Sequence, residues 1–109
     1  MANTPLAQLG NFLHVYDFRV KPGTGDGFIE LFESFDHSGK NPMHASPAQV
    51  TDGVLCRDEN DPEHFYLIAE WKDNAAHRAL REQIMHEVRP ELTGLVEGDF
   101  MPIYANAVA

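Results

Sequence analysis

The spacing of hydrophobic and polar residues predicts a strand and then a helix in the first third of the chain. From Phe12 to Val20 the pattern has a period of two, as in a strand with two unlike faces. One face of this strand is strongly aromatic and carries Phe12, His14, Tyr16 and Phe18. After a Pro/Gly turn at 21–25, apolar side chains recur at helical spacing, at Phe28, Leu31, Phe32 and Phe35.

The rest of the chain predicts three more strands and one more helix. Strands over 50–57 and 65–71 flank a polar turn and form a hairpin. An amphipathic helix follows over 75–88, where Pro90 should end it, and a last strand covers about 98–106. The order β-α-β-β-α-β is that of the ferredoxin-like split motif. We therefore expect an α+β fold with an antiparallel sheet and both helices on one face.

The third predicted strand is apolar on both faces. Phe65, Leu67, Ala69 and Trp71 lie on one face, while Tyr66 and Ile68 lie on the other. Two helices on one side leave the second apolar face without a cover, and a second copy of the same sheet is the simplest cover. The pattern thus predicts a homodimer whose sheets pack face to face.

Composition narrows the class of protein. The 109 residues suit a flexible leader over 1–10, without the features of a signal peptide, and a single domain over 11–109. A net charge of -9 argues against nucleic acid or an anionic membrane as the partner. No stretch approaches the roughly 18 apolar residues that a membrane span needs. Cys56 is the single cysteine, so no intrachain disulfide forms, and we expect a reducing, cytoplasmic location.

Trp71 and His77 are the first candidates for a functional site. Trp71 is the only tryptophan and stands where the third strand gives way to the second helix. A large aromatic side chain there either walls a pocket or fills the core. His77 lies at the centre of the apolar stripe of that helix, so it points at the sheet. It is either a hydrogen-bonded core residue or an acid/base in a cavity.

Three further residues could share this space. If the aromatic face of the first strand points at the helices, His14 and Tyr16 meet Trp71 and His77 there. Such a group would suit a flat aromatic substrate, or it would simply form an aromatic core with polar tips. Arg81 lies near the edge of the same helical stripe and either reaches an anionic substrate or remains on the surface.

The six histidines raise the question of a metal. No pair has the close spacing of a helix or hairpin ligand motif, although His37 and His44 share a loop and could bind an ion adventitiously. We expect no metal and no cofactor.

The run from Asp61 to Ala76 resembles the signature dp-x-x-f-x-l-x-E-x-W-x-(s/d)-x-x-A of the antibiotic biosynthesis monooxygenase family. The turn 20–23 and the Phe/Leu helix after it resemble the first strand and turn of that family, and the resemblance spans about 12–106. It implies a dimeric α/β barrel with one pocket per subunit, between sheet and helices. Members include cofactor-free oxygenases that turn polycyclic phenols into quinones, quinol oxidases, haem-degrading enzymes and proteins without known activity.

The resemblance also carries expectations for individual residues. Trp71 matches the motif tryptophan, which lines the pocket of the polyketide-type oxygenases, and His77 falls where such an enzyme has a pocket tyrosine. Haem degradation is disfavoured, because Tyr16 stands near the place of its asparagine, and Leu80 and Pro90 stand where that pattern has tryptophan and histidine.

We therefore expect a cofactor-independent monooxygenase that oxidises a phenolic or polyketide-like aromatic to a quinone, with a small aromatic and O2 as its partners. The catalytic candidates are His77 and Trp71, and the substrate-binding candidates are Tyr16, His14, Phe18, Arg81 and Leu67. A non-catalytic binding protein of the same fold, or a cyclase or isomerase with His77 as acid/base, are the alternatives.

Overall fold

The computed structural model describes residues 4–39, 41–87 and 94–109. It confirms the predicted order of elements, with a short 3-10 helix in the long loop after the first helix. The elements are β1 Phe12–Val20, α1 Gly25–Asp36, the 3-10 helix Met43–Ala45, β2 Val54–Arg57, β3 His64–Trp71, α2 Asn74–Glu87, β4 Val96–Glu97 and β5 Pro102–Asn106.

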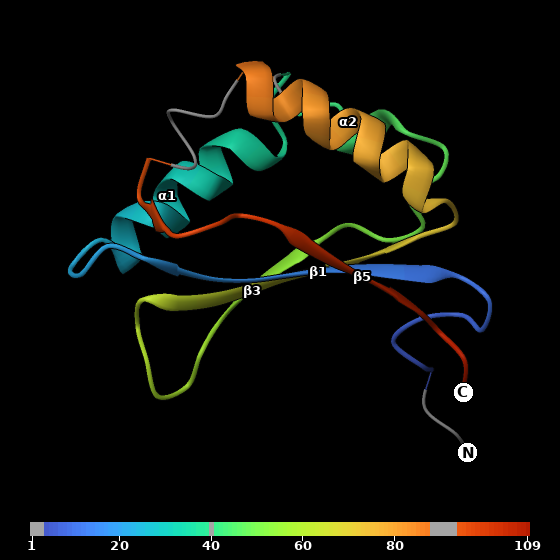
Figure 1. The fold of residues 1–109 in the computed structure, drawn as a ribbon, viewed down its shortest axis with the longest axis horizontal. Helices are drawn as coiled ribbons and strands as arrows, with labels where there is room; N and C mark the ends of the chain where they lie inside the picture. The colour runs from blue at the N-terminus through green and yellow to red at the C-terminus, as the bar shows by residue number, and fades with distance from the viewer. Residues whose placement is uncertain (1–3, 40, 88–93) are drawn as a thin grey trace.

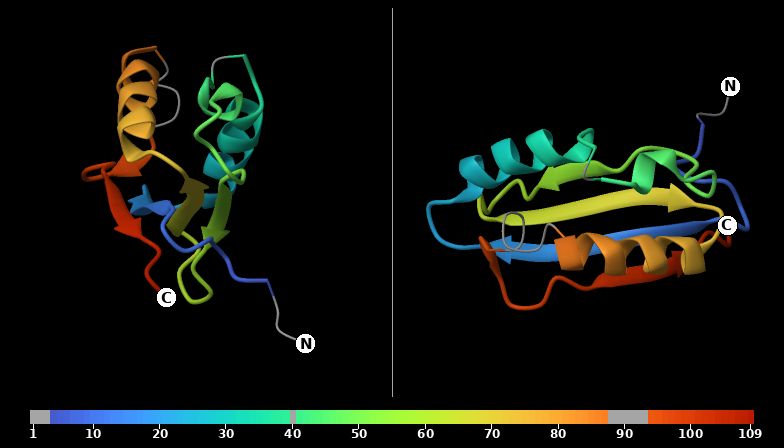
Figure 2. Two further views of the ribbon diagram at one scale, coloured as in Figure 1. Left: turned by 90° about the vertical axis from the view of Figure 1, so that its right-hand side faces the viewer. Right: turned by 90° about the horizontal axis from the view of Figure 1, so that it is seen from above.

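The strands form one antiparallel sheet in the order β2-β3-β1-β4, with β5 also paired to β1. Both helices lie over the same face of this sheet, and no helix of the described residues covers the opposite face (Figures 1 and 2). The fold is therefore the ferredoxin-like α+β fold that the sequence predicted. No helix in the described part of the chain is long and apolar enough to cross a membrane.

The predicted alternation of β1 is confirmed by burial. His14, Tyr16, Phe18 and Val20 are buried under the helices, whereas Asp17 and Arg19 point outward and are exposed. Beneath α1 the core is almost wholly aromatic: Phe28 and Phe65 are at most 1% exposed and pack against Phe18. One residue of the predicted helical stripe is misplaced, because Leu31 is 39% exposed on the outer side of α1.

The last strand differs from the prediction of one strand over 98–106. It is two short strands that pair with different parts of β1, with a break between them. Gly98 begins the break with φ 75°, a backbone conformation that glycine adopts without strain. The break carries Phe100 into the core, where its ring stacks on Tyr16 at 4.5 Å between centroids. In an unbroken strand, residues 98–101 would instead have been hydrogen-bonded to β1.

The second strand is also shorter than predicted, since it begins at Val54 rather than at residue 50. Before it, the chain pairs with the end of β3 through an isolated bridge between Gln49 and Trp71, and the carbonyl of Glu70 accepts hydrogen bonds from the amides of Val50 and Thr51. The helix α2 begins one residue earlier than predicted, and its predicted end at Val88 lies outside the described residues.

A carboxylate on the open face anchors the chain before β1. Glu70 points away from the helices yet is only 3% exposed, because it accepts hydrogen bonds from the amide of Gln8 at 2.9 Å and from Nδ2 of Asn11 at 2.8 Å. Gly10 donates its amide to Ala107 at 2.9 Å. Residues 8–11 are thus tied to the sheet next to the helix-free face.

Candidate functional site

A cavity of about 90 Å³ lies between the sheet and the two helices. Its floor comes from β1 and β3, its sides come from the second half of α1 and from α2, and the loop after α1 closes the remaining side. Five of the predicted site residues line it together, namely His14, Tyr16, Leu67, His77 and Arg81. The aromatic face of β1 and the inner face of α2 therefore border one hollow space.

His14 and His77 form the polar centre of this wall. Their imidazole rings stack with centroids 4.0 Å apart and an angle of 24° between the planes. They are 5% and 1% exposed, respectively. Nδ1 of His77 shares a hydrogen bond of 2.8 Å with the hydroxyl of Tyr104, whereas Nδ1 of His14 has no partner among the described residues. Nδ1 of His14 and Nδ1 of His77 are thus both buried away from bulk water.

Burial keeps both imidazoles neutral. It lowers the pKa of His14 to about 4. It lowers the pKa of His77 to about 3, and the nearby His14, Arg81 and Arg78 add to that shift. Two imidazolium rings cannot share this stack, because each would lose its hydration next to a like charge. At neutral pH the pair therefore offers lone pairs, not positive charge.

Tyr16 and Arg81 meet beside the histidines. Burial raises the pKa of the Tyr16 phenol to about 12, and the guanidinium of Arg81 partly opposes this shift. Nη2 of Arg81 donates to the carbonyl of Phe100, while its buried Nε has no partner in the described chain. Arg81 is thus held at the cavity by the break between β4 and β5, with donor capacity left over. It is the one permanently charged cation among the residues that line the cavity, as far as the structure describes them.

Two predicted site residues do not line the cavity. Trp71 is 0% exposed and packs edge-on against His77, with ring centroids 5.1 Å apart. It supports the histidine from behind. Phe18 lies deeper, in the aromatic core beneath α1, where its ring meets Phe100 and Phe28. Periodicity gave both residues the correct face of the sheet but could not give their position along it.

Other residues of the site were missed from the sequence. Tyr104 lies opposite His14 in the pairing of β5 with β1, so the alternation of the last strand could have placed it on the cavity face. The loop after α1 contributes Asn41, Met43, His44 and Gln49 to the lining of the cavity. No helical or strand periodicity in the loop sequence predicts this position. The loop is thus one wall of the cavity.

The same wall contains a group of metal-binding type. Asp36, His37 and His44 each offer a ligand atom, and these atoms lie within 4.8 Å of one another. Burial lowers the pKa of His44, but its hydrogen bonds to Asp36 and Asp52 outweigh this and raise the pKa above the ordinary value.

Comparison with known proteins gives a fold but no close relative. No protein-family model matches the sequence, and neither does any curated protein. Solved structures do match. One of them is a crystal structure that is named antibiotic biosynthesis monooxygenase. It aligns with this chain at a TM-score of 0.70 and 21% sequence identity, over 90% of this chain and 99% of its own.

Two further structures agree with it. A protein from Bordetella bronchiseptica, whose name proposes the same activity, has a TM-score of 0.72 and 16% identity over 92% of this chain and 99% of its own. A conserved protein from Methanosarcina mazei Go1 has a TM-score of 0.70 and 18% identity over 90% of this chain and 93% of its own. The chain therefore has the ferredoxin-like α+β fold of solved proteins that are named antibiotic biosynthesis monooxygenase.

Proposed function

We propose that this protein is a cofactor-independent monooxygenase that oxidises a small phenol to a quinone. The observation that carries the proposal is the stacked, neutral pair of His14 and His77 on the wall of an aromatic cavity. The names of the solved proteins with this fold point to the same class of reaction.

The proposed reaction begins with a proton transfer from the bound phenol to His77. With the proton of Nδ1 donated to the oxygen of Tyr104, Nε2 keeps a lone pair that can accept a proton. Because burial lowers the pKa of His77 to about 3, it is a weak base on its own. The phenolate that forms beside it offsets this, since a nearby anion favours the imidazolium. Arg81 stabilises the same developing negative charge.

The oxidation then uses O2 alone. The phenolate passes one electron to O2, and the two radicals recombine to a peroxide at a ring carbon that bears hydrogen. The O–O bond breaks, that carbon loses its hydrogen as a proton, and the products are one quinone and one water. All oxygen and hydrogen atoms come from the phenol and O2, with His77 returning the proton to the leaving oxygen.

The size of the cavity narrows the substrate class. About 90 Å³ is well below the roughly 300–1,000 Å³ of pockets for drug-sized ligands. A single aromatic ring is therefore the favoured substrate, stacked against Tyr16 and Phe100. A polycyclic, polyketide-like substrate would need the loop at 41–53 to move outward.

The test is O2 consumption with a panel of small hydroquinones and naphthols in the presence of a chelator. We expect uptake above the rate in buffer, with one oxygenated quinone and no H2O2 formed per O2 consumed, and no added flavin, haem or metal. Ligand binding without any turnover would instead support a non-catalytic binding protein. A change of substrate without O2 uptake would support a cyclase or isomerase.

We also propose that the helix-free face of the sheet pairs with a second copy. The register aligns Val54, Ile68, Val15 and Ile103 in one apolar row across four strands. The outer two of these are 53% and 56% exposed, although both are large hydrophobic residues. Covering such a row is the usual reason for two sheets to pack together.

Replacing Ile103 with aspartate is therefore expected to convert a dimer into a monomer. A charge buried between the two sheets without a partner would cost several kcal/mol. Sedimentation velocity at fixed concentration measures the effect. Leu31→Asp is the matched control, because Leu31 is exposed on α1, on the other side of the molecule. A monomeric wild type would contradict the proposal.

A further inference from the structure

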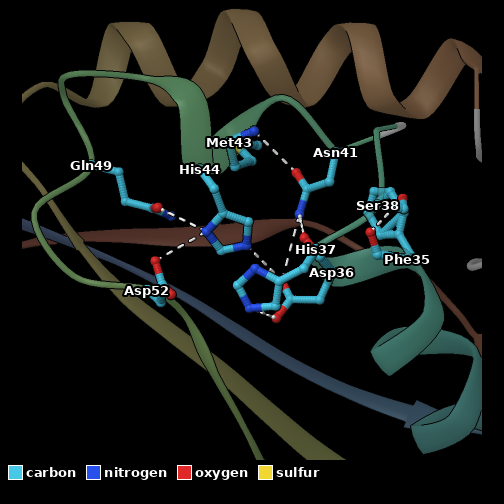
Figure 3. A network of polar contacts seen from close by, with 9 residues as sticks. All are labelled: Phe35, Asp36, His37, Ser38, Asn41, Met43, His44, Gln49 and Asp52. Carbon is cyan, nitrogen blue, oxygen red and sulfur yellow. Dashed lines mark hydrogen bonds and ion pairs between the residues drawn. The ribbon is translucent and has the colours of Figure 1, made fainter.

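The end of α1 and the loop after it bring two histidines and one carboxylate together. Asp36 is the last residue of α1, His37 follows it, and His44 lies on the 3-10 helix. Nε2 of His44 is 3.0 Å from Oδ1 of Asp36, and Nε2 of His37 is 3.6 Å from Oδ2 of the same carboxylate. The two imidazole rings stack on each other with centroids 4.4 Å apart, and the edge of each ring faces the same carboxylate (Figure 3).

These distances are close to those of ligands that share one metal ion. Metal–nitrogen and metal–oxygen bonds of about 2.0–2.2 Å place two neighbouring ligand atoms about 3 Å or slightly more apart. The His44–Asp36 pair already has this separation, and Nε2 of His37, 3.6 Å from Oδ2 of Asp36, lies slightly beyond it.

The surroundings of His44 provide a second, independent observation. Its other nitrogen, Nδ1, lies 3.0 Å from Oδ1 of Asp52 and 3.1 Å from Oε1 of Gln49 (Figure 3). A carboxylate on the far nitrogen fixes the ring and its tautomer so that Nε2 faces the ion, as in most histidine–metal sites. Asn41 holds the other ligand, because its Nδ2 donates to the backbone carbonyl of Asp36 at 2.7 Å.

Access to the group is also suitable for an ion. The side chains of His44 and Asp36 are 19% and 20% exposed, whereas that of His37 is 67% exposed. The ligands are thus partly dehydrated on the cavity side and open to solvent on the other. Three protein ligands leave coordination positions free for water or for a polar group of a ligand in the cavity.

We infer that Asp36, His37 and His44 bind a divalent transition-metal ion at the rim of the cavity. Imidazole nitrogen with carboxylate oxygen suits zinc, nickel, cobalt or iron better than magnesium or calcium. Asp36 and His44 also line the cavity, so the ion lies where an anionic group of a bound molecule can reach it. This site is additional to the proposed oxidation, which uses the opposite wall and needs no metal.

The test is metal binding by untagged protein that has been stripped with a chelator. We expect saturation by Zn²⁺ and Co²⁺ at one ion per chain in calorimetry, with a Kd of about 10 μM or tighter. The Co²⁺ absorption spectrum should show imidazole coordination. No substrate is present, so the result does not depend on whether the protein consumes O2.

Substitutions test the three proposed ligands and Asp52, which holds His44 in place. His44→Gln and Asp36→Asn are each expected to weaken binding at least about tenfold, and Asp52→Asn about 10- to 100-fold with the stoichiometry kept. His37→Gln is the most informative variant, because this side chain is 67% exposed and its ring contact, the stack on His44, belongs to the proposed site itself. His64→Gln is the matched control, since His64 also pairs with a carboxylate, that of Asp17, on the helix-free face.

Three results would overturn the inference. The first is no saturable binding below about 1 mM, which leaves an ion-paired His44 as the whole explanation of the geometry. The second is equal loss of affinity in His64→Gln and His44→Gln, which would mean diffuse binding to surface histidines. The third is wild-type affinity in a folded His37→Gln variant, which would remove the third ligand.

Discussion

Replacing His77 with glutamine is expected to lower turnover of the phenolic substrate by about 10²–10⁴-fold and to leave KM nearly unchanged. Glutamine retains a polar group that can reach the hydroxyl of Tyr104, but it cannot accept a proton at neutral pH. The cavity and its stacking surfaces would therefore persist while the base is lost. Initial rates of O2 uptake over a range of substrate concentrations give both parameters.

Two controls make this result specific. His64→Gln makes the same chemical change on the helix-free face and should leave both parameters as they are. Tyr104→Phe removes the hydroxyl that holds Nδ1 of His77, so it should reduce turnover less than the loss of the base itself. If His77→Gln raised KM and spared turnover, His77 would bind the ring without transferring its proton.

Trp71 belongs with the positioning residues in this scheme. It is fully buried behind His77, with its ring edge-on and its Nε1 without a partner among the described residues. The cavity surface does not include it. In the proposed reaction, its bulk would keep the imidazole of His77 from swinging away from the cavity.

The fold could be predicted because its signals are local. A period of two in β1 and β3 and an apolar stripe on each helix determine which face is buried, and the order of elements then allows few topologies. The same reasoning puts His14, Tyr16 and His77 in one space on the condition that the aromatic face of β1 points at the helices, and in the structure it does. It failed at Gly98, where a single residue with positive φ interrupts the edge strand and turns Phe100 inward.

The loop wall could not be predicted, for a different physical reason. His37 and His44 are separated by a loop with no helical or strand period, so their spacing alone carries no geometric information. Only the end of α1, the 3-10 helix and the bridge of Gln49 to the end of β3 bring them to the carboxylate of Asp36. Contacts set by a loop depend on the whole fold, and no pattern within the loop reports them.

Acidification is expected to destabilise this protein strongly through the buried histidine pair. In the unfolded chain both histidines titrate near 6.5, whereas in the fold burial lowers the pKa of His14 to about 4 and that of His77 to about 3. The unfolded state therefore takes up protons first as the pH falls. The free energy of unfolding is therefore unaffected by these groups above pH 6.5. It falls as the pH drops below 6.5, down to pH 4 for His14 and down to pH 3 for His77.

The size of this effect follows from proton linkage. Each group costs about 1.4 kcal/mol per pH unit within that window, so the two together should remove about 6 kcal/mol by pH 4. A typical domain has only about 5–15 kcal/mol in total. Urea unfolding at pH 7, 6, 5 and 4.5, at one protein concentration, measures the slope. The single tryptophan, Trp71, reports it by fluorescence, with circular dichroism as a second probe.

The double variant His14→Phe/His77→Phe isolates the contribution of the pair. Phenylalanine preserves the ring stack and removes both titrating nitrogens, so the variant should lose about 2.7 kcal/mol per pH unit less than the wild type between pH 6 and pH 4.5. His44 acts in the opposite direction, because its raised pKa favours the folded state at low pH, and it does so equally in both proteins. Equal slopes would mean that the folded pair accepts protons readily. The imidazoles would then be hydrated, and a cavity that admits that much water could not shield a phenolate next to His77.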